Sequence, residues 1–266
     1  MRFGSQLYRL GIPVNPRQNR YSYPIFGQIQ IGGRIRFSHF RRLFRPPPGR
    51  PFRLLDFGCG NGNYGFVLAD KYPASRIDSY DADRSKFGLL RKLKNKPPNL
   101  FFLSGDDFDD LEPSSYDHIL SIDVLEHIED DAGTLKELAR LLKLGGRLFI
   151  HVPRNHRKWR TLLKNIRREK HDGHLRDEYR EKEIRGLVKK IETLRIRKLV
   201  YTFGFRGELA WEIDRKLIRC CPKLRYPLFP LLLLLARLDA RGKNSWGNGF
   251  FIIAKKISGD RKTIRK

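Results

Sequence analysis

Cysteines, acidic residues near the amino end and long apolar runs are all scarce in this chain. Of the three cysteines, Cys59 stands alone and Cys220 and Cys221 are adjacent, which gives neither a disulfide framework nor the spaced ligand pairs of a zinc site. Such cysteine usage is typical of a reducing, intracellular setting. No run reaches the ~18 apolar residues of a membrane-spanning helix, and the start lacks the apolar core of a signal peptide. We therefore expect a cytoplasmic protein.

Acidic residues are also unevenly distributed. Residues 1–50 contain ten arginines and no acid, residues 51–153 contain 13 basic and 17 acidic residues, and residues 154–266 contain 32 basic and 12 acidic residues. The formal charge of +26 thus comes from the two ends of the chain. Cationic segments of this kind attract the phosphates of lipid or nucleic acid, and a solvated basic surface without a partner is the alternative.

Glycine is concentrated in one stretch, residues 53–63, which read Arg-Leu-Leu-Asp-Phe-Gly-Cys-Gly-Asn-Gly-Asn. An apolar run ends in an acid, glycines follow at alternate positions, and a helical pattern begins at Tyr64. Glycine permits unusual backbone angles and a close approach of the backbone to a ligand, and the helix that follows directs its free N–H groups to the same place. The pattern predicts a ligand site, with an empty glycine-rich turn as the alternative.

The region after residue 51 alternates strands with helices, which is the pattern of a parallel sheet with crossover helices. Predicted strands cover residues 53–56, 76–80, 100–103, 118–122 and 147–152. Predicted helices cover residues 64–71, 85–94 and 132–143, the last of them closed by Gly145 and Gly146. We expect a basic N-terminal arm at 1–50, a folded domain at 51–256 with a helical insertion at 206–243 before the last strand, and a basic tail at 257–266.

Acids stand where predicted strands end, and they indicate the kind of ligand. Asp81 follows the second strand about 20 residues after the glycines, where a carboxylate can accept both hydroxyls of a ribose. Asp106 and Asp107 end the third strand. The Gly-x-Gly-x-Gly spacing differs from that of a dinucleotide site, and acids would repel a pyrophosphate. A cationic sulfonium cofactor that carries an amino group suits these acids better.

Five motifs in this order resemble the class I S-adenosylmethionine-dependent methyltransferases, at residues 54–62, 80–83, 105–108, 116–127 and 138–153. Within that family the chain is similar to the methyltransferase type 11/12 group with Val-Leu-Glu-His, here residues 124–127, which includes quinone-pathway O-methyltransferases. The resemblance implies an α/β fold with a Rossmann-like, seven-stranded, mostly parallel sheet in the order 3-2-1-4-5-7-6 and helices on both faces.

The resemblance also implies S-adenosyl-L-methionine as cofactor and assigns residues to it. The glycine turn 58–62 would meet the methionine part, Asp81 would accept the ribose hydroxyls, and Asp106 would face the adenine amino group. Asp56 would lie near the amino end of the methionine part. The full cofactor-binding set is Asp56, Gly58, Cys59, Gly60, Asn61, Gly62, Asp81, Ala82, Asp106, Asp107, Phe108, Ile122 and Asp123.

Methyl transfer to a hydroxyl benefits from a general base, and two histidines are candidates. His127, the first candidate, follows the fourth strand, and its alternative role is to cap or pack the next helix. His151 ends the fifth strand, and it could equally be a core histidine. Asp123 joins the candidate catalytic set. If the turn is helical, Asp123, Glu126 and His127 share a face that could hold a divalent metal, although three ligands of mixed type are weak support for one.

Three segments outside the sheet could meet the acceptor or a partner. Segment 25–44 alternates arginines with apolar residues and could lie on a membrane, close over a pocket or pack on the domain. Segment 154–178 is expected to cover the acceptor pocket. Segment 226–238 is rich in leucine after a cationic stretch, so it is either an interfacial membrane element or a helix buried on the domain or at a dimer interface. The predicted acceptor is a small or lipid- or glycan-linked molecule at an anionic membrane surface; RNA methylation or silent nucleic-acid binding is the alternative.

Overall fold

The computed structural model describes residues 30–87, 96–154 and 179–258. The chain divides into two compact units, which we describe separately. The described residues of the first, here called the helical unit, are 30–50, 153–154 and 200–250. Those of the second, here called the sheet unit, are 51–87, 96–152, 179–199 and 251–258.

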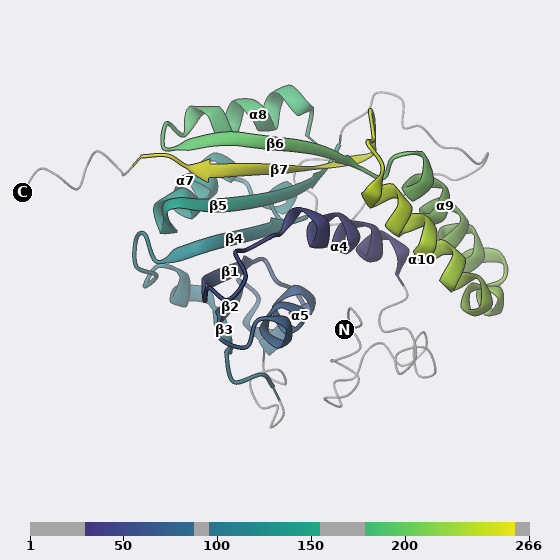
Figure 1. The fold of residues 1–266 in the computed structure, drawn as a ribbon, viewed down its shortest axis with the longest axis horizontal. Helices are drawn as coiled ribbons and strands as arrows, with labels where there is room; N and C mark the ends of the chain where they lie inside the picture. Colours follow the sequence, from purple (N-terminus) through teal and green to yellow (C-terminus); the bar gives the residue numbers. More distant parts are fainter. Residues whose placement is uncertain (1–29, 88–95, 155–178, 259–266) are drawn as a thin grey trace, which may run out of the picture. The chain divides into compact units, whose positions relative to one another are not determined.

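The strands form one seven-stranded sheet in the order β3-β2-β1-β4-β5-β7-β6, which confirms the expected α/β fold (Figure 1). The pairs β1–β2, β1–β4, β2–β3 and β4–β5 are parallel. The strand bounds are β1 Arg53–Phe57, β2 Arg76–Asp81, β3 Leu100–Ser104, β4 Tyr116–Ile122, β5 Leu142–Pro153, β6 Leu194–Thr202 and β7 Gly249–Lys256.

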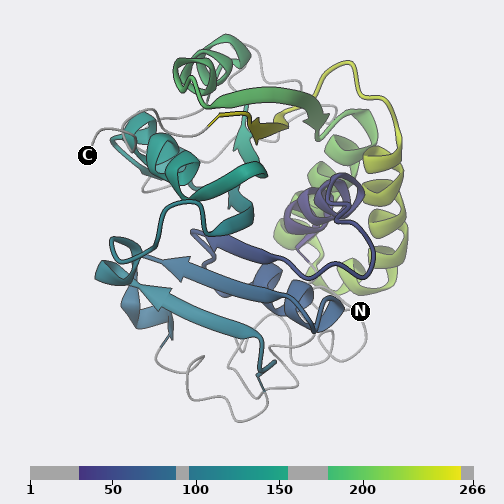
Figure 2. The ribbon, with the colours of Figure 1, turned by 60° about the vertical axis from the view of Figure 1, so that its left-hand side comes forward.

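Two strands that lie away from the edges of the sheet, β1 and β7, are almost completely buried. Every residue of β1 after Arg53 is buried, and β7 is buried at all positions except Lys255. Continuous burial of this kind is typical of strands that are covered on both faces. The helices of the sheet unit are α5 Asn63–Lys71, α7 Asp131–Leu141 and α8 Glu181–Lys190. Helix α5 connects β1 to β2 in the chain and packs against β2 and β3 (Figure 2).

The end of α7 differs from the sequence-based expectation. The helix ends at Leu141, and β5 begins at once with Leu142. Gly145 has a φ of +82° inside β5, where the pairing register with β4 shifts between Tyr116 and His118. The glycine pair therefore belongs to a bulge in the strand and does not terminate the helix. The helix predicted at 85–94 falls largely outside the described residues, which include only the short 3-10 helix η1 Arg84–Lys86.

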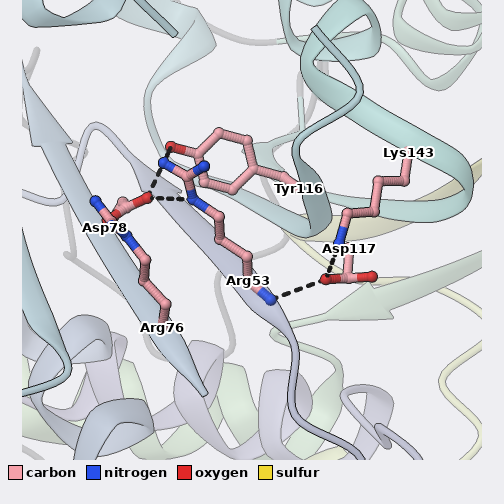
Figure 3. Close-up of polar contacts among 6 residues, drawn as sticks. All are labelled: Arg53, Arg76, Asp78, Tyr116, Asp117 and Lys143. Carbon is pink, nitrogen blue, oxygen red and sulfur yellow. Dashed lines mark hydrogen bonds and ion pairs between the residues drawn. The ribbon is translucent and has the colours of Figure 1, made fainter. Parts of the chain in front are cut away.

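A polar network joins the amino ends of three strands (Figure 3). Asp78 Oδ2 accepts hydrogen bonds from Arg53 Nε at 2.8 Å and from the Tyr116 hydroxyl at 2.9 Å, and Asp78 Oδ1 accepts from Arg76 Nε at 2.9 Å. Burial, together with the Asp78 charge, raises the pKa of Tyr116 well above its usual range, so the hydroxyl stays protonated. Because these groups begin strands β1, β2 and β4, they lie at the edge of the sheet opposite to the strand ends discussed below.

The helical unit has its own apolar core. It contains α4 Ile31–Leu43, α9 Phe205–Cys220, the short 3-10 helix η4 Pro222–Leu224 and α10 Arg225–Arg241, and α4 lies alongside α10 in both ribbon views (Figures 1 and 2). Its core residues are Ile31, Ile35, Phe203, Ala210, Phe229, Leu232 and Ala236. The basic segment 25–44 thus contains a helix that packs on this core, and the predicted insertion 206–243 contains two helices.

The leucine-rich helix α10 is buried on one face and exposed on the other. Phe229, Leu232 and Ala236 are buried, whereas Leu228, Leu231 and Leu234 are among the exposed large hydrophobic residues. One face of α10 therefore packs on the core, as the buried-helix interpretation of segment 226–238 expects, and the membrane interpretation stays a prediction. Among the described residues, no helix is long and apolar enough to cross a membrane.

Candidate cofactor site and active site

The glycine turn follows β1 and has left-handed backbone angles at each glycine. The φ angles are +72° at Gly58, +53° at Gly60 and +69° at Gly62. The N–H groups of Gly58 and Cys59 both donate to the Tyr80 carbonyl, at 2.8 and 2.9 Å, which fixes the turn against β2. A Cβ at Gly58 would lie 2.4 Å from Val124 Cγ2, whereas a Cβ at Gly60 would meet nothing within 4 Å. Gly58 thus allows close packing, and Gly60 borders open space.

Asp81, the last residue of β2, is tied directly to this turn. Its Oδ2 accepts a hydrogen bond from the Gly60 N–H at 2.8 Å, and its Oδ1 accepts one from the Asp83 N–H at 3.1 Å. Backbone donors therefore hold the carboxylate in one orientation at the carboxyl edge of the sheet. The structure brings together the predicted glycines and the predicted ribose acceptor, and exposed Ala82 follows Asp81.

Asp56 is buried near the end of β1, and its ionisation is perturbed. Burial raises its pKa to about 7; the charge of Asp81 adds to that effect, and a hydrogen bond from the Gly65 N–H opposes it. Asp56 Oδ2 has no hydrogen-bond partner among the described residues. A buried carboxyl oxygen without a partner is costly, so this one is suited to a cationic or hydrogen-bonding ligand.

Aromatic rings gather beside the ends of β1, β2 and β3. The Phe108 ring centroid lies 5.2 Å from that of Phe57 and 5.0 Å from that of Tyr80, and the Phe57 and Tyr80 rings are stacked at 5.4 Å. Phe108 belongs to the 3-10 helix η2 Gly105–Phe108, which also contains Asp106 and Asp107. The side chains of those two acids lie outside the described part of the structure.

Asp123 and His151 form a pair across the ends of β4 and β5. The Asp123 carboxylate Oδ1 lies 2.5 Å from His151 Nδ1, and the Asp123 N–H donates to the His151 carbonyl at 3.0 Å. Asp123 has a φ of +54°, which is uncommon for a residue with a side chain and costs on the order of 1–3 kcal/mol. His151 is only 2% exposed, and its ring packs edge-on against Phe251 at 4.7 Å. Ile122, the last residue of β4, is half-buried.

The neighbouring turn does not form a metal site. It is the 3-10 helix η3 Leu125–His127, in which Glu126 is buried and His127 is exposed, so these two side chains do not share one environment. Within the ranges that the structure describes, no group of three or more His, Cys, Asp or Glu residues could hold a metal ion. The three-residue face of Asp123, Glu126 and His127 that their spacing allowed is therefore not formed.

Several contributing residues were absent from the sequence-based site. Gly65 is one, since a Cβ there would lie 2.2 Å from Ser79 Oγ, and its absence lets α5 pack closely on β2. Val124 is another, because it fills the space beside Gly58. Phe57 and Tyr80 complete the aromatic cluster around Phe108. The only sequence signal for Gly65 was a fourth glycine shortly after the turn.

These residues fit a ligand with cationic, hydroxyl-bearing and aromatic parts. The Asp56 oxygen without a partner can receive a cationic amino group, the held Asp81 carboxylate can accept hydroxyls, and the open space at Gly60 leaves room for the ligand between them. Cys59 and exposed Asn61 lie in the same turn. The donor set therefore agrees with the cofactor that the resemblance implied.

Comparisons with known proteins agree with this site. A family model described as "Methyltransferase domain" matches residues 32–192. Trans-aconitate 2-methyltransferase of Azoarcus sp. (strain BH72) is 30% identical over 114 residues, which are 43% of this chain and 44% of that protein. Ubiquinone biosynthesis O-methyltransferase of Paracidovorax citrulli (strain AAC00-1) is 32% identical over 108 residues, 39% of this chain and 44% of that protein. The chain thus spans less than half the length of these curated relatives.

Solved structures share the fold at low sequence identity. Phosphoethanolamine N-methyltransferase 2 of Haemonchus contortus, in complex with S-adenosyl-L-methionine, matches with a TM-score of 0.54 at 18% identity, over 87% of this chain and 53% of that one. An S-adenosylmethionine-dependent methyltransferase from Mesorhizobium loti matches with a TM-score of 0.53 at 16% identity, over 85% of this chain and 100% of that one. At these identities the likeness concerns the fold alone.

Proposed function

The chain belongs to the methyltransferase-domain family of S-adenosylmethionine-dependent enzymes, and from this premise we propose that it methylates a hydroxyl or amine of a small or lipid- or glycan-linked acceptor at a membrane surface. The catalytic domain in this proposal covers residues 51–256. The observation that supports it most is the Asp81 carboxylate, held by the Gly60 N–H at the end of β2 and thereby aligned with the glycine turn.

The chain's own residues hold the cofactor in this proposal. Asp81 accepts the ribose hydroxyls, Asp56 receives the amino end of the methionine part, and the aromatic cluster with Phe108 lies beside the adenine ring. The remaining predicted residues, Asp106 and Asp107, keep their proposed place at the adenine. S-adenosyl-L-methionine supplies an electrophilic methyl group on sulfur when it is bound. The protein then has mainly to align the acceptor, which can contribute several kcal/mol.

A positioned base removes the proton from a hydroxyl acceptor, and the Asp123–His151 pair is suited to this role. If His151 Nδ1 donates its proton to Asp123, the other ring nitrogen, Nε2, keeps a lone pair that can accept the acceptor's proton. Asp123 then stabilises the imidazolium that forms. A base of this kind typically contributes about 10²- to 10⁴-fold in rate. Exposed His127 remains the alternative base.

The membrane part of the proposal rests on the surface of the helical unit. Leu231 and Leu234 are 54% and 48% exposed on α10, and exposed basic residues such as Lys216 and Lys223 precede this helix. An interfacial helix binds a membrane in two ways: its apolar side chains are buried shallowly in the bilayer, and nearby cations are attracted to anionic headgroups.

The methyl-transfer proposal is tested by a labelled-methyl transfer screen over lipid, glycan and quinone extracts. We expect label in one extract with the wild-type protein and a loss of about 100-fold or more with His151→Gln, while His127→Gln retains most of the rate. Equal loss in the two variants would remove the special role of His151. No transfer to any of the extracts would contradict the proposed acceptor classes.

The membrane proposal is tested separately by flotation with anionic liposomes and by retention of RNA at rising salt. Leu231→Glu/Leu234→Glu changes only exposed positions, so we expect loss of flotation with unchanged cofactor binding. Salt-sensitive RNA retention together with absent flotation would favour the nucleic-acid alternative.

A further inference from the structure

A pocket lined by six arginines lies between α4 and α10 in the helical unit. Its volume is ≈ 380 Å³, and its lining residues are Arg34, Phe37, Ser38, Arg41, Arg42, Arg45, Leu233, Arg237, Ala240 and Arg241. None of these residues is acidic, and all of them belong to the helical unit, whereas the cofactor-site residues described above belong to the sheet unit. The volume falls within the range of small-ligand pockets, which is about 300–1,000 Å³.

Helical spacing places the arginines on facing sides of the two helices. On α4, Arg34, Ser38 and Arg41 recur at steps of four and three residues, so they share one face. On α10, Leu233, Arg237 and Arg241 recur at steps of four residues. The two helices are held together by the apolar core that includes Ile35 and Phe229, so the pocket is part of the packed unit.

The described acids of the helical unit are buried. In the described residues of the helical unit, the acids are Glu208, Glu212, Asp214 and Asp239, and each is at most 2% exposed. Asp239 pairs with His39 at 2.8 Å, and Asp214 pairs with Arg225 at 2.5 Å. Arg41, Arg237 and Arg241 form no hydrogen bond or ion pair with the described residues. Their charge therefore faces solvent inside the pocket.

Two of the arginines also stabilise the helix ends. Arg42 Nη1 donates to the Ala240 carbonyl at 2.6 Å, and Arg45 Nε donates to the Arg42 carbonyl at 3.3 Å. Cations near the last carbonyls of a helix are favourable, so this role alone explains Arg42 and Arg45. Arg41 and Arg241 also lie in the last turns of α4 and α10, but Arg34 and Arg237 lie outside those turns, so this role does not explain them. The pocket thus contains more guanidinium groups than the helix ends require. Several guanidinium groups in one place can bind a phosphate through many planar hydrogen bonds.

The geometry points to a binding site for a doubly charged phosphate group, either a phosphomonoester or a diphosphate, in the arginine pocket between α4 and α10. The site goes beyond methyl transfer and does not depend on it. The phosphate could belong to a soluble molecule or to a lipid headgroup, since exposed Leu234 lies about 60° around α10 from Arg237 at about 100° per residue. Charge-assisted hydrogen bonds of arginine to phosphate are among the strong polar contacts of proteins.

Calorimetric titration of the full chain with inorganic pyrophosphate and with glycerol 3-phosphate tests the site. The test variant is Arg41→Gln/Arg237→Gln, and the control is Arg195→Gln/Arg197→Gln on β6, which removes the same charge from exposed positions outside the pocket lining. We expect the test variant to lower the affinity at least tenfold and the control to change it less than threefold. Equal losses would show a non-specific charge effect and overturn the proposal, as would absence of binding to all phosphate probes.

Vesicles distinguish the two sources of the phosphate. The same proteins are mixed with phosphatidylcholine vesicles that contain either phosphatidic acid, a phosphomonoester lipid, or phosphatidylserine, an anionic lipid without one. Binding is pocket-dependent if the test variant loses it and the control keeps it. Pocket-dependent binding to phosphatidic acid but not to glycerol 3-phosphate would identify the ligand as a lipid headgroup. Pocket-dependent binding to both would show that the pocket recognises the phosphate group itself. Unchanged binding of the test variant to phosphatidic acid, together with no pocket-dependent binding of the soluble probes, contradicts the site. Titration with S-adenosyl-L-methionine is the readout that reports on the methyltransferase proposal instead.

Discussion

Substitution of Gly58 by alanine should destabilise the protein through two separable effects. A residue with a Cβ at a φ of +72° costs about 1–2 kcal/mol, and the new methyl group would lie 2.4 Å from Val124 Cγ2. Overpacking of this kind typically costs about 1–3 kcal/mol more, so we expect a loss of about 2–5 kcal/mol for Gly58→Ala. The free energy of unfolding in urea measures this loss.

Gly145→Ala is the matched control because it lies in the same unit with a φ of +82°, and its Cβ would meet only Lys255 Cε at 3.7 Å. It should show the backbone cost alone, about 1–2 kcal/mol. Val124→Ala combined with Gly58→Ala should recover about 1 kcal/mol or more relative to the sum of the single changes. Equal losses for Gly58→Ala and Gly145→Ala would refute the packing argument.

Gly60→Ala separates stability from ligand binding. Its Cβ would meet nothing within 4 Å, so the stability loss should match that of Gly145→Ala. The methyl group would enter the space proposed for the cofactor, so we expect the affinity for S-adenosyl-L-methionine to fall at least tenfold, whereas Gly145→Ala keeps it. If Gly60→Ala kept the wild-type affinity, the proposed position of the cofactor at this turn would be contradicted.

Three further substitutions test the electrostatics. The folded pKa of Asp56 is about 7, above its ordinary value of 3.8. The free energy of unfolding of wild type is therefore highest below about pH 4 and falls by up to about 4 kcal/mol as the pH rises through 7. The stability of Asp56→Asn relative to wild type should therefore increase from pH 5 to pH 8. An equal difference between the urea midpoints of the two proteins at both pH values would contradict this. Burial lowers the pKa of His118 to about 4, so its contribution is lost as the pH falls from 6.5 towards 4. Wild type should thus lose up to about 3 kcal/mol relative to His118→Asn over that range, and parallel pH curves would count against it. Tyr116→Phe removes the hydrogen bond to Asp78 and should cost about 1–2 kcal/mol in urea unfolding, whereas no loss would mean that the network in Figure 3 adds nothing to stability.

Local chemistry explains which parts of the fold the sequence predicted. The glycine turn and Asp81 could be located because glycines and acids at strand ends have short, local signatures. The glycine pair at 145–146 was misassigned, since glycine after a helix usually caps it, and only the pairing of β5 with β4 reveals a bulge. Local sequence patterns therefore predicted the presence of helices and strands more accurately than the residues at which they end.

Contacts between distant residues could not be predicted in this way. The Asp123–His151 pair depends on the register that sets Ile122 opposite His151, and the Gly58–Val124 contact depends on β1 pairing with β4. The arginine pocket joins helices that lie about 200 residues apart in the chain, as the hydrogen bond between Arg42 and Ala240 shows. Basic composition indicated a phosphate partner, but only packing gathers those charges in one place.

Calorimetric titration of S-adenosyl-L-methionine into wild type and Asp81→Ala tests the central claim most directly, with Asp83→Ala as the control. Asp81 is held by Gly60 and faces the proposed ribose, whereas the exposed Asp83 carboxylate accepts from Ser85. We predict one-to-one binding to wild type, a loss of at least about tenfold for Asp81→Ala from two charge-assisted hydrogen bonds, and little change for Asp83→Ala. Equal affinity of wild type and a folded Asp81→Ala variant would contradict the cofactor site described above.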